Sequence, residues 1–557
     1  MRQTVVDGVP VVVTPAPGPV QATLYFRVGQ ADETAATRGV THLVEHLALH
    51  GLGPFDHRSN GGTGQTVTQF ETTGTPDEVA TFLTGVCRSL SALRLGRLDV
   101  ERRVLRTEEA AREADLETVS ARWRHGARNY GLISYAEFGV GTLTADAVDA
   151  WATSHFTRDN AVLAITGELP AGLTLPLPSG VRRPMPAASA ILPVTPAYFP
   201  GPGGWLGVTS MVDRGTPASL YARLLHRALM RSLRTEAGLS YTTAARYRVG
   251  SAGRAEITAH ADADAGHVEE AVDLFVRTLQ SGDWIDEAEL ARAVQDARTA
   301  MAEPSFAAGA TRRWAQDILC GLPPRTREDI AAGLKAVSLA DVAEVARACW
   351  ANALLMLPGV RAERYGCERA PMSSRAVPPG RRFAARDGGR AYLVVGKDGV
   401  GLADEGRYAT VRYTDCVLLV RHTDGGRLVL GADGLGVPLE PEVFAVDAAT
   451  LASVDAAVNP AVIVDRERDA NDIPRPDRAR RRDRRIRAAK VALHRFWHSR
   501  VAFPAATLTV MAFVLVALCA GSTGSGTGVL RVLVALGGLL AFLGGLLVWR
   551  HHRYAHW

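Results

Sequence analysis

The chain has 557 residues, which is too long for one hydrophobic core, so we expect on the order of three or four folding units. Its net charge of +5 is small, and we expect no nucleic-acid partner. The six cysteines are scattered and none forms a CxxC pair. That pattern excludes a disulfide framework and a cysteine zinc site, and it indicates a reducing compartment.

Residues 1–170 have a mixed order of predicted strands and helices. The strands are expected at residues 9–14, 20–28, 65–72 and 161–166, and the helices at residues 39–49, 76–93 and 98–128. This order lacks the regular alternation of a parallel-sheet protein. The sequence therefore predicts an α+β fold class for the first domain.

A proline-rich linker at residues 170–202 separates this domain from a similar one. Residues 203–358 repeat the pattern, with a helix expected at 218–235 and strands within 241–260. A second linker, rich in Arg, Pro and Gly, follows at residues 361–381. We therefore expect two related α+β domains in the first two thirds of the chain.

Residues 382–460 read as short strands separated by glycine turns, with a closing helix at 446–458. This pattern of short strands and turns fits a small β-rich domain, either PH-like or a plain β-sandwich. Residues 465–500 form a basic juxtamembrane linker in which arginine accumulates.

Residues 501–549 predict a transmembrane hairpin. The segment 501–520 carries no charge, and 529–549 is interrupted only by Arg531. Two buried helices of a soluble protein are the alternative. Basic flanks on both sides favour the cytoplasm, so we expect a two-span cell-membrane protein that contacts lipid through the hairpin. The N-terminus lacks signal-peptide features, so both termini and the bulk of the chain are expected in the cytoplasm.

The motif His42-Leu43-Val44-Glu45-His46 carries the clearest chemical signal. On a helix, His42 and His46 project from one face and can share a metal ion. Catalytic zinc takes three protein ligands and keeps one position open, while a nearby carboxylate removes a proton from water. We therefore expect one Zn²⁺ per chain, with Glu45 as the general base.

The third ligand is expected to be an acid on another helix. Glu101 and Glu108 lie two turns apart on one face of the helix predicted after residue 98. Their competitors are Glu109, Glu113 and Glu117. A solvated, salt-bridged helix face would read the same way, so the residues alone leave this choice open.

These motifs resemble those of the M16 family of zinc metallopeptidases. The stretch Gly39-Val-Thr-His-Leu-Val-Glu-His-Leu is similar to the family's HxxEH signature. Glu101 and Glu108 match a second family signature, which implies that Glu108 ligates zinc and that Glu101 is a supporting acid. Asn60-Gly-Gly-Thr63 is similar to a family segment beside the active site, which implies that Asn60 and Thr63 contact substrate.

The second domain carries a further part of the resemblance. Leu233-Arg234-Thr-Glu-Ala-Gly-Leu-Ser-Tyr241 looks like a family stretch in the domain after the catalytic one. This implies that Arg234 and Tyr241 hold the substrate backbone and stabilise the oxyanion. A buried Arg and Tyr at a helix end is the structural alternative. Family members assemble four such domains, so a homodimer or a heterodimer with a related subunit is implied.

One feature departs from the family pattern. Between His46 and Glu108 lie 61 residues, fewer than the family usually has, and the shortfall falls mostly before Asn60. We expect this to trim a wall of the substrate cavity more than it affects the metal.

The sequence thus predicts a membrane-anchored zinc endopeptidase that hydrolyses short or unfolded peptides. The first alternative is a non-catalytic M16-like scaffold or partner subunit, since the family contains degenerate subunits. In another alternative the β-rich domain is the working part and binds lipid or protein, with the basic residues 478–487 facing anionic head groups.

Overall fold

The computed structural model describes residues 1–50, 52, 58–113, 115–250 and 253–476. Residues 1–474 form one compact unit, and residues 475–557 are assigned to a second. The predicted hairpin at 501–549 and residues 477–500 of the predicted basic linker lie outside the described residues. Within the described part of the chain, no helix combines the length and the apolar character needed to cross a bilayer.

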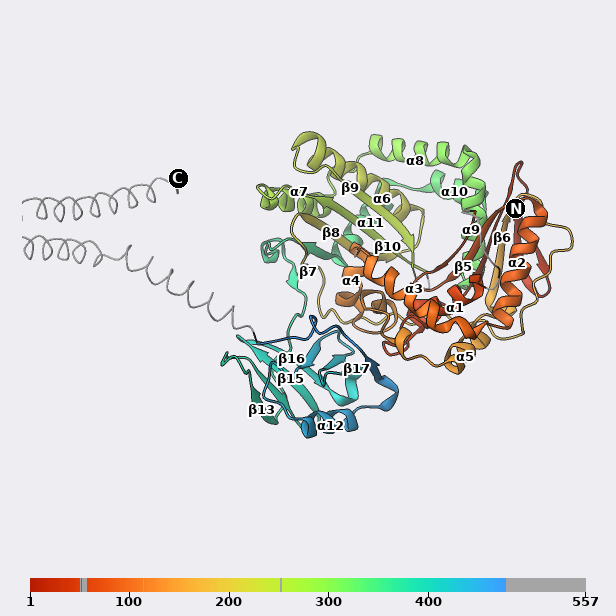
Figure 1. The fold of residues 1–557 in the computed structure, drawn as a ribbon. Helices are drawn as coiled ribbons and strands as arrows, with labels where there is room; N and C mark the ends of the chain where they lie inside the picture. The colour runs from red at the N-terminus through yellow and green to blue at the C-terminus, as the bar shows by residue number, and fades with distance from the viewer. Residues whose placement is uncertain (51, 53–57, 114, 251–252, 477–557) are drawn as a thin grey trace, which may run out of the picture. The chain divides into compact units, whose positions relative to one another are not determined.

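The first lobe is built on a six-stranded sheet with the order β1-β2-β6-β3-β5-β4. Figure 1 labels β5 and β6 of this sheet. Its strands are β1 (Arg2–Val6), β2 (Val9–Thr14), β3 (Val20–Phe26), β4 (Ser59–Thr63), β5 (Thr68–Gly74) and β6 (Ala161–Thr166). Its helices are α1 (Val40–His50), α2 (Pro76–Ser91), α3 (Leu98–Ala111), α4 (Leu116–His125) and α5 (Ala145–His155). Helices α1, α2 and α5 bury their apolar faces in one core with this sheet.

The second lobe repeats this topology with a sheet of order β12-β7-β11-β8-β10-β9. Its strands are β7 (Ala197–Pro200), β8 (Trp205–Asp213), β9 (Thr243–Val249), β10 (Arg254–Asp262), β11 (Leu354–Leu357) and β12 (Glu368–Arg369). Its helices are α6 (Thr216–Leu229), α7 (Val268–Ser281), α8 (Glu287–Ala302), α9 (Pro304–Leu319), α10 (Arg327–Ala336) and α11 (Leu339–Ala351). In both sheets one central pair is parallel, β2 with β6 in the first and β7 with β11 in the second. The strands that follow this pair in each order are all joined by antiparallel pairings.

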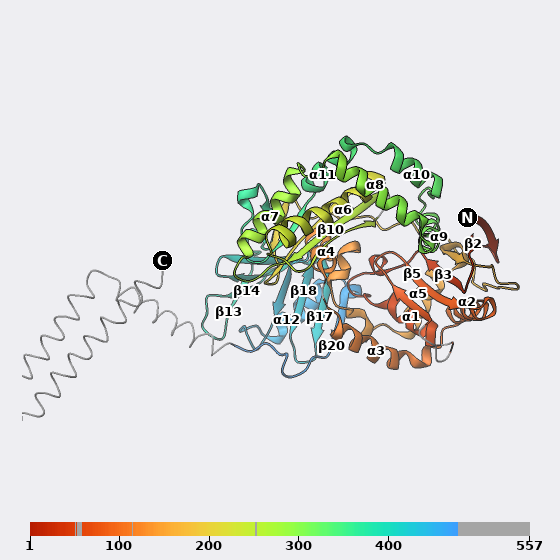
Figure 2. The same ribbon diagram turned by 90° about the horizontal axis from the view of Figure 1, so that it is seen from above.

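Helices α4 and α9 are exchanged between the lobes (Figures 1 and 2). Helix α4 follows α3 of the first lobe but packs on the second sheet, where the ring of Trp123 stacks on Phe199 at 5.6 Å. Helix α9 belongs to the second lobe but covers the first sheet, where Ala315 and Leu319 share an apolar cluster with Tyr25. Each sheet therefore has one face covered by its own helices and the other by a helix of its neighbour.

Two predicted helices differ from the structure. The helix expected at residues 98–128 is divided into α3 and α4, because Arg112 has an extended backbone and Asp115 caps a new helix by accepting from Thr118 N at 2.7 Å. The helix expected at 218–235 ends as α6 at Leu229 and continues as a π-helix, η6 (Met230–Glu236). Such π segments often occur at functional sites.

The β-rich part contains two four-stranded sheets around a shared apolar core. The first holds β13 (Arg381–Ala384), β14 (Tyr392–Val395), β15 (Gly399–Asp404) and β16 (Arg407–Arg412), and the second holds β17 (Cys416–His422), β18 (Arg427–Gly431), β19 (Gly436–Leu439) and β20 (Ile463–Arg466). Helix α12 (Ala448–Ala457) precedes β20, which pairs in parallel with β17. Strand β20 therefore extends this fold beyond residue 460, into the start of the predicted basic linker.

Candidate metal centre

Helix α1 begins at a buried N-terminal cap. Oε1 of Glu33 accepts from Thr41 N at 2.9 Å, and its Oε2 accepts from Gly39 N at 3.0 Å. Arg38 pairs with Glu33 at 3.1 Å, with both side chains fully buried. Gly39 has φ +99°, and a Cβ there would lie 2.5 Å from Cγ2 of Val140. These contacts fix where the helix starts and hence which way its side chains point.

Helix α1 buries one face in the first sheet and turns its histidines to the other side. Leu43, Val44 and Leu47 are at most 1% exposed. The side chains of His42 and His46 are 14% and 16% exposed, and their ring centroids lie 4.8 Å apart. The i, i+4 spacing thus produces the adjacent imidazoles expected from the sequence.

Glu108 on α3 completes a cluster with these imidazoles. Its Oε2 lies 3.6 Å from Nε2 of His42 and 3.6 Å from Nε2 of His46. The three potential ligand atoms lie within 4.8 Å of one another. A tetrahedral zinc site with ~2.0–2.1 Å bonds sets its ligand atoms ~3.3 Å apart. Both carboxylate–imidazole distances are close to this value, and two imidazoles with one carboxylate are ligand types that could hold Zn²⁺.

A second set of carboxylates lies behind the imidazoles. Nδ1 of His42 is 3.2 Å from both oxygens of Glu137, and Nδ1 of His46 is 3.4 Å from Oε2 of Glu101. Both acids are nearly buried, with 2% and 7% of their side chains exposed. Carboxylates in this position hold the imidazole orientation and make Nε2 the ligand atom. The sequence implied this supporting role for Glu101.

The pKa values of the His42–Glu137 pair move in opposite directions. Burial lowers the pKa of His42, but the hydrogen bond and charge of Glu137, with the charges of Glu45 and Glu108, raise it above its ordinary value. Burial raises the pKa of Glu137, but His42, Arg38 and Arg112 bring it below its ordinary value. Glu137 is therefore an ionised partner for the imidazole.

Glu45 lies beside the histidines but is held separately. Its side chain accepts a hydrogen bond from Thr63 Oγ1 at 3.1 Å, and its Oε2 is 4.0 Å from Nε2 of His42. Burial raises the pKa of Glu45, while His42 and His46 lower it. A Cβ added at Gly61 would lie 2.5 Å from Glu45 Oε1, so the glycine leaves room for this carboxylate. The arrangement suits proton transfer rather than metal ligation.

No protein-family model matches the sequence, and no curated protein matches it. Solved structures do resemble it. A protease from Helicobacter pylori has a TM-score of 0.53 at 14% identity, covering 64% of this chain and 99% of that one. The first half of the periplasmic protease PqqL from Escherichia coli has a TM-score of 0.52 at 14% identity, covering 66% and 93%. A peptidase M16 inactive domain from Pseudomonas fluorescens has a TM-score of 0.51 at 15% identity, covering 64% and 98%.

The two lobes have the M16 peptidase fold. Identities this low establish the fold alone. The sequence resemblance covers residues 1–358 and does not extend to the β-rich part.

The acids that competed for the third ligand position point elsewhere in this M16 fold. Oε1 of Glu109 accepts from the backbone N of Glu137 at 2.5 Å. Glu117 lies 3.4 Å from Thr258 Oγ1 on the second sheet, and Glu113 is exposed. Within the described residues, Glu108 is thus the acid grouped with both histidines.

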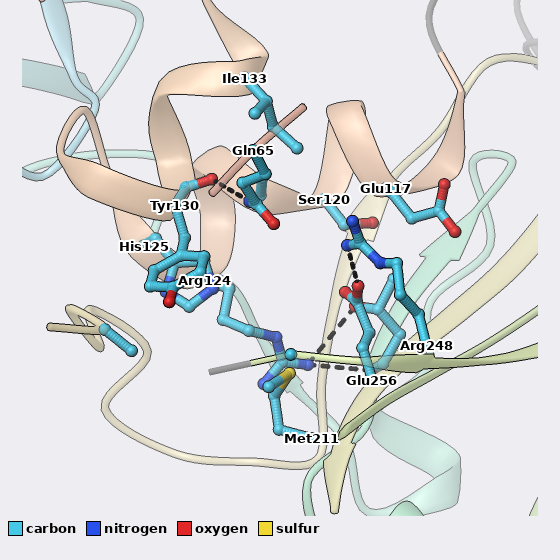
Figure 3. Close-up of a pocket in the computed structure, with 14 residues that line it drawn as sticks. Gln65, Glu117, Ser120, Arg124, His125, Tyr130, Ile133, Met211, Arg248 and Glu256 are labelled. Carbon is cyan, nitrogen blue, oxygen red and sulfur yellow. Dashed lines mark hydrogen bonds and ion pairs between the residues drawn. The ribbon is translucent and has the colours of Figure 1, made fainter. Parts of the chain in front are cut away.

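Glu117 lines a small pocket between α4 and the second sheet (Figure 3). Arg248 and Glu256, which face each other on β9 and β10, form an ion pair on its wall, and Arg124 donates to Thr209 O at 2.9 Å. The pocket has a volume of about 40 Å³, enough for ordered water and too small for a peptide. It belongs to the interface between the lobes of the M16 fold.

Arg234 and Tyr241 lie together in the second lobe. The guanidinium of Arg234 is 5.0 Å from the centroid of the Tyr241 ring, and Tyr241 is 76% exposed. Asp262 holds the Tyr241 backbone by accepting from its N at 2.9 Å. The structural alternative of a buried Arg and Tyr does not hold, because both side chains are exposed, Arg234 within η6 and Tyr241 in the segment after it.

Asn60 and Thr63 both lie on β4, the edge strand of the first sheet. Thr63 reaches Glu45, whereas Asn60 is exposed. Glu137 and Glu33 were not expected from the sequence. Neither stands in a recognisable motif, and only the folding of the loops around η1 (Gln30–Asp32) and η4 (Phe138–Gly141) brings them to α1.

Proposed function

We propose that this chain is a zinc-dependent endopeptidase. One observation carries the proposal: two Nε2 atoms on α1 and one carboxylate on α3 converge within 4.8 Å, while Glu45 stands beside them without joining the cluster. A structural cluster would have no need for this separate, buried acid. The M16 fold of the two lobes supports the same conclusion.

The chemistry divides between the ligands and their neighbours. His42, His46 and Glu108 would hold the ion, which when bound acts as a Lewis acid that lowers the pKa of water and polarises a peptide carbonyl. Glu45 removes the proton from the attacking water and then delivers it to the leaving amine. Thr63 fixes the carboxylate of Glu45 for both transfers.

The peptide is proposed to bind in an extended form along β4. In the described residues this strand forms the edge of its sheet, so a row of its backbone groups is available for pairing with another chain. Asn60 and Thr63 lie on this strand, within the same sheet that packs against α1. Pairing through the backbone requires an unfolded segment, which is why we propose short or unfolded peptides as substrates.

Arg234 and Tyr241 are proposed to contact the substrate from the second lobe. Their exposure leaves both side chains accessible, and an Arg stacked on a Tyr presents fixed donors that can stabilise an oxyanion. The dimeric assembly and the membrane anchor through residues 501–549 remain proposals that rest on the sequence.

The test starts with the purified full-length chain, its Glu45→Gln and His46→Ala variants, and a quenched-fluorescent peptide library. We expect about one zinc per chain in the wild type and in Glu45→Gln, and we expect Glu45→Gln to lose cleavage because it cannot accept the proton. His46→Ala should lose both zinc and cleavage. A wild-type chain that binds no zinc after loading would refute the proposal.

A non-catalytic scaffold is the second candidate. The observation that favours it is the similarity to an M16 domain described as inactive. A scaffold that retains the cluster would bind zinc but show no cleavage, and Glu45→Gln would then match the wild type in every assay. Comparing the cleavage activity of the wild type with that of Glu45→Gln therefore distinguishes the endopeptidase from the scaffold.

A further inference from the structure

The β-rich part packs directly against the segment that supports the metal cluster. Leu418, Val420 and Val464 of its second sheet share an apolar cluster with Leu132, and Phe138 packs against it. These last two residues flank Glu137 in the chain, so the contact lies beside the carboxylate that orients His42.

The docking includes a close approach of backbones. The N–H of Ala127 donates to the carbonyl of Ala432 at 3.1 Å. A Cβ added at Gly126 would lie 2.1 Å from the same carbonyl, and one added at Gly434 would lie 2.7 Å from Tyr135 Oη. Gly126 thus permits a backbone contact that a side chain would prevent, and Gly434 leaves room for the Tyr135 hydroxyl, which indicates a specific seat for the β-rich part on the first lobe.

Arg466 on strand β20 extends from this contact surface toward the group formed by His42, His46 and Glu108. Nη2 of Arg466 lies 3.7 Å from Oε2 of Glu109, the neighbour of the proposed ligand Glu108. The other oxygen of Glu109 accepts from Glu137 N at 2.5 Å, and Glu137 contacts Nδ1 of His42 at 3.2 Å. A continuous series of contacts therefore connects the β-rich part to a proposed zinc ligand.

Arg466 makes a second contact on the same segment. Its guanidinium lies 5.5 Å from the centroid of the Phe138 ring, and Phe138 directly follows Glu137. Arg466 therefore contacts Glu109, which accepts a hydrogen bond from the Glu137 N–H, and Phe138, which follows Glu137 in the chain. It also supplies positive charge beside the carboxylate of Glu109.

We propose that Arg466 is a positioning residue for the metal centre. It fixes Glu109, which fixes the backbone of Glu137, whose carboxylate then sets the orientation of the His42 imidazole. The β-rich part, when docked on the first lobe, thereby raises the metal affinity of that lobe. This inference rests on the proposed zinc function and adds a control on the site from outside the M16 fold.

The experiment titrates the metal-free full-length chain with Co²⁺ and follows its visible absorption, with Zn²⁺ competition to obtain affinities. The variants are Arg466→Ala, Arg466→Lys and Glu109→Gln. The matched control is Arg421→Ala, since Arg421 is also on this sheet, is 38% exposed against 40% for Arg466, and pairs with Asp465 at 2.6 Å.

We expect Arg466→Ala to weaken metal binding about three- to tenfold, less than the 10–100-fold typical of a direct partner of a ligating histidine. Its cobalt spectrum should shift as the geometry at His42 relaxes. Arg466→Lys should recover much of the affinity because it restores the charge. Glu109→Gln should weaken binding in the same direction, and the double variant should lose less than the sum of the two.

Arg421→Ala should bind as the wild type does. Wild-type affinity and spectrum in both Arg466→Ala and Glu109→Gln would overturn this inference while leaving the zinc proposal standing. A wild-type chain that binds no Co²⁺ or Zn²⁺ would overturn the proposed function itself. If Arg466→Ala fails to fold, Arg466→Lys and Glu109→Gln still decide the matter, since neither removes the packing of β20.

Discussion

Both carboxylate oxygens of Glu137 lie 3.2 Å from Nδ1 of His42. Glu137→Gln would keep the size of the side chain but remove the charge that favours an Nδ1–H donor. We expect metal affinity to fall about 10–100-fold, as is typical of partners behind ligating histidines. Isothermal titration of the metal-free protein with Zn²⁺ measures the change. Asp99→Asn on α3, where the side chain is 80% exposed, is the control, and an equal loss in both variants would contradict the assignment.

Gly61 gives a test of Glu45 that leaves the proposed ligands intact. In Gly61→Ala the new Cβ would lie 2.5 Å from Glu45 Oε1 and 2.8 Å from Leu49 Cδ1, so the carboxylate must move. We expect kcat to fall at least about tenfold, since proton transfer depends on hydrogen-bond geometry. Bound zinc, measured by mass spectrometry, should stay near one per chain. Gly96→Ala, where an added Cβ meets no atom within 4 Å, is the control. Loss of zinc in Gly61→Ala would show that the change acts on the ligands instead.

Arg124 ties α4 to the second lobe. Its guanidinium donates to Thr209 O at 2.9 Å and to Asn352 O at 3.0 Å, and burial lowers its pKa. Arg124→Met leaves both carbonyls without this donor, and unpaired buried groups cost about 1–3 kcal/mol each. We expect the free energy of unfolding to fall by about 2 kcal/mol or more, measured by urea denaturation. Arg122→Met, at an exposed position of the same helix, should stay within about 0.5 kcal/mol.

The thiol of Cys349 provides a pH-dependent probe of the second lobe. Burial raises its pKa to about 11, so the reactive thiolate is scarce at pH 8 and becomes common only as the pH rises toward that value. We expect alkylation by iodoacetamide at pH 8 to be at least about 100-fold slower than in the urea-unfolded chain, and to quicken about tenfold per pH unit. Mass spectrometry of the Cys349 peptide measures both rates. Equal rates in the native and unfolded chains would contradict the burial of this thiol.

The sequence predicted which side chains share a helix face, because this information is local. A helix fixes the relation of His42 to His46 within one turn, and another helix does the same for Glu101 and Glu108. One local signal was nevertheless overlooked. Asp7 and Gly8 form a tight turn with φ values of +48° and +86° and join β1 to β2, and an Asp-Gly pair is a strong hairpin signal.

The parts that could not be predicted depend on contacts between distant segments. Glu137 reaches His42 across 95 residues of chain, and Arg466 belongs to a separate fold. The exchange of α4 and α9 could not be predicted from the periodicity of apolar residues. That periodicity shows which face of a helix is apolar, but it does not show which sheet packs against that face. The break between α3 and α4 had a signal in Asp115, which a charged and otherwise continuous helix pattern concealed.

The exchanged helices also bear on how the chain matures as it leaves the ribosome. The proposed metal ligands lie within the first 108 residues, but Tyr25 and Val162 on the outer face of their sheet share an apolar cluster with α9, which begins at Pro304, 138 residues after β6 ends at Thr166. The nascent first lobe therefore exposes an apolar surface until α9 has been synthesised, and chaperones bind such surfaces. Under the proposed zinc function, metal capture should accordingly follow synthesis of the second lobe rather than accompany synthesis of the motif proposed to bind the ion.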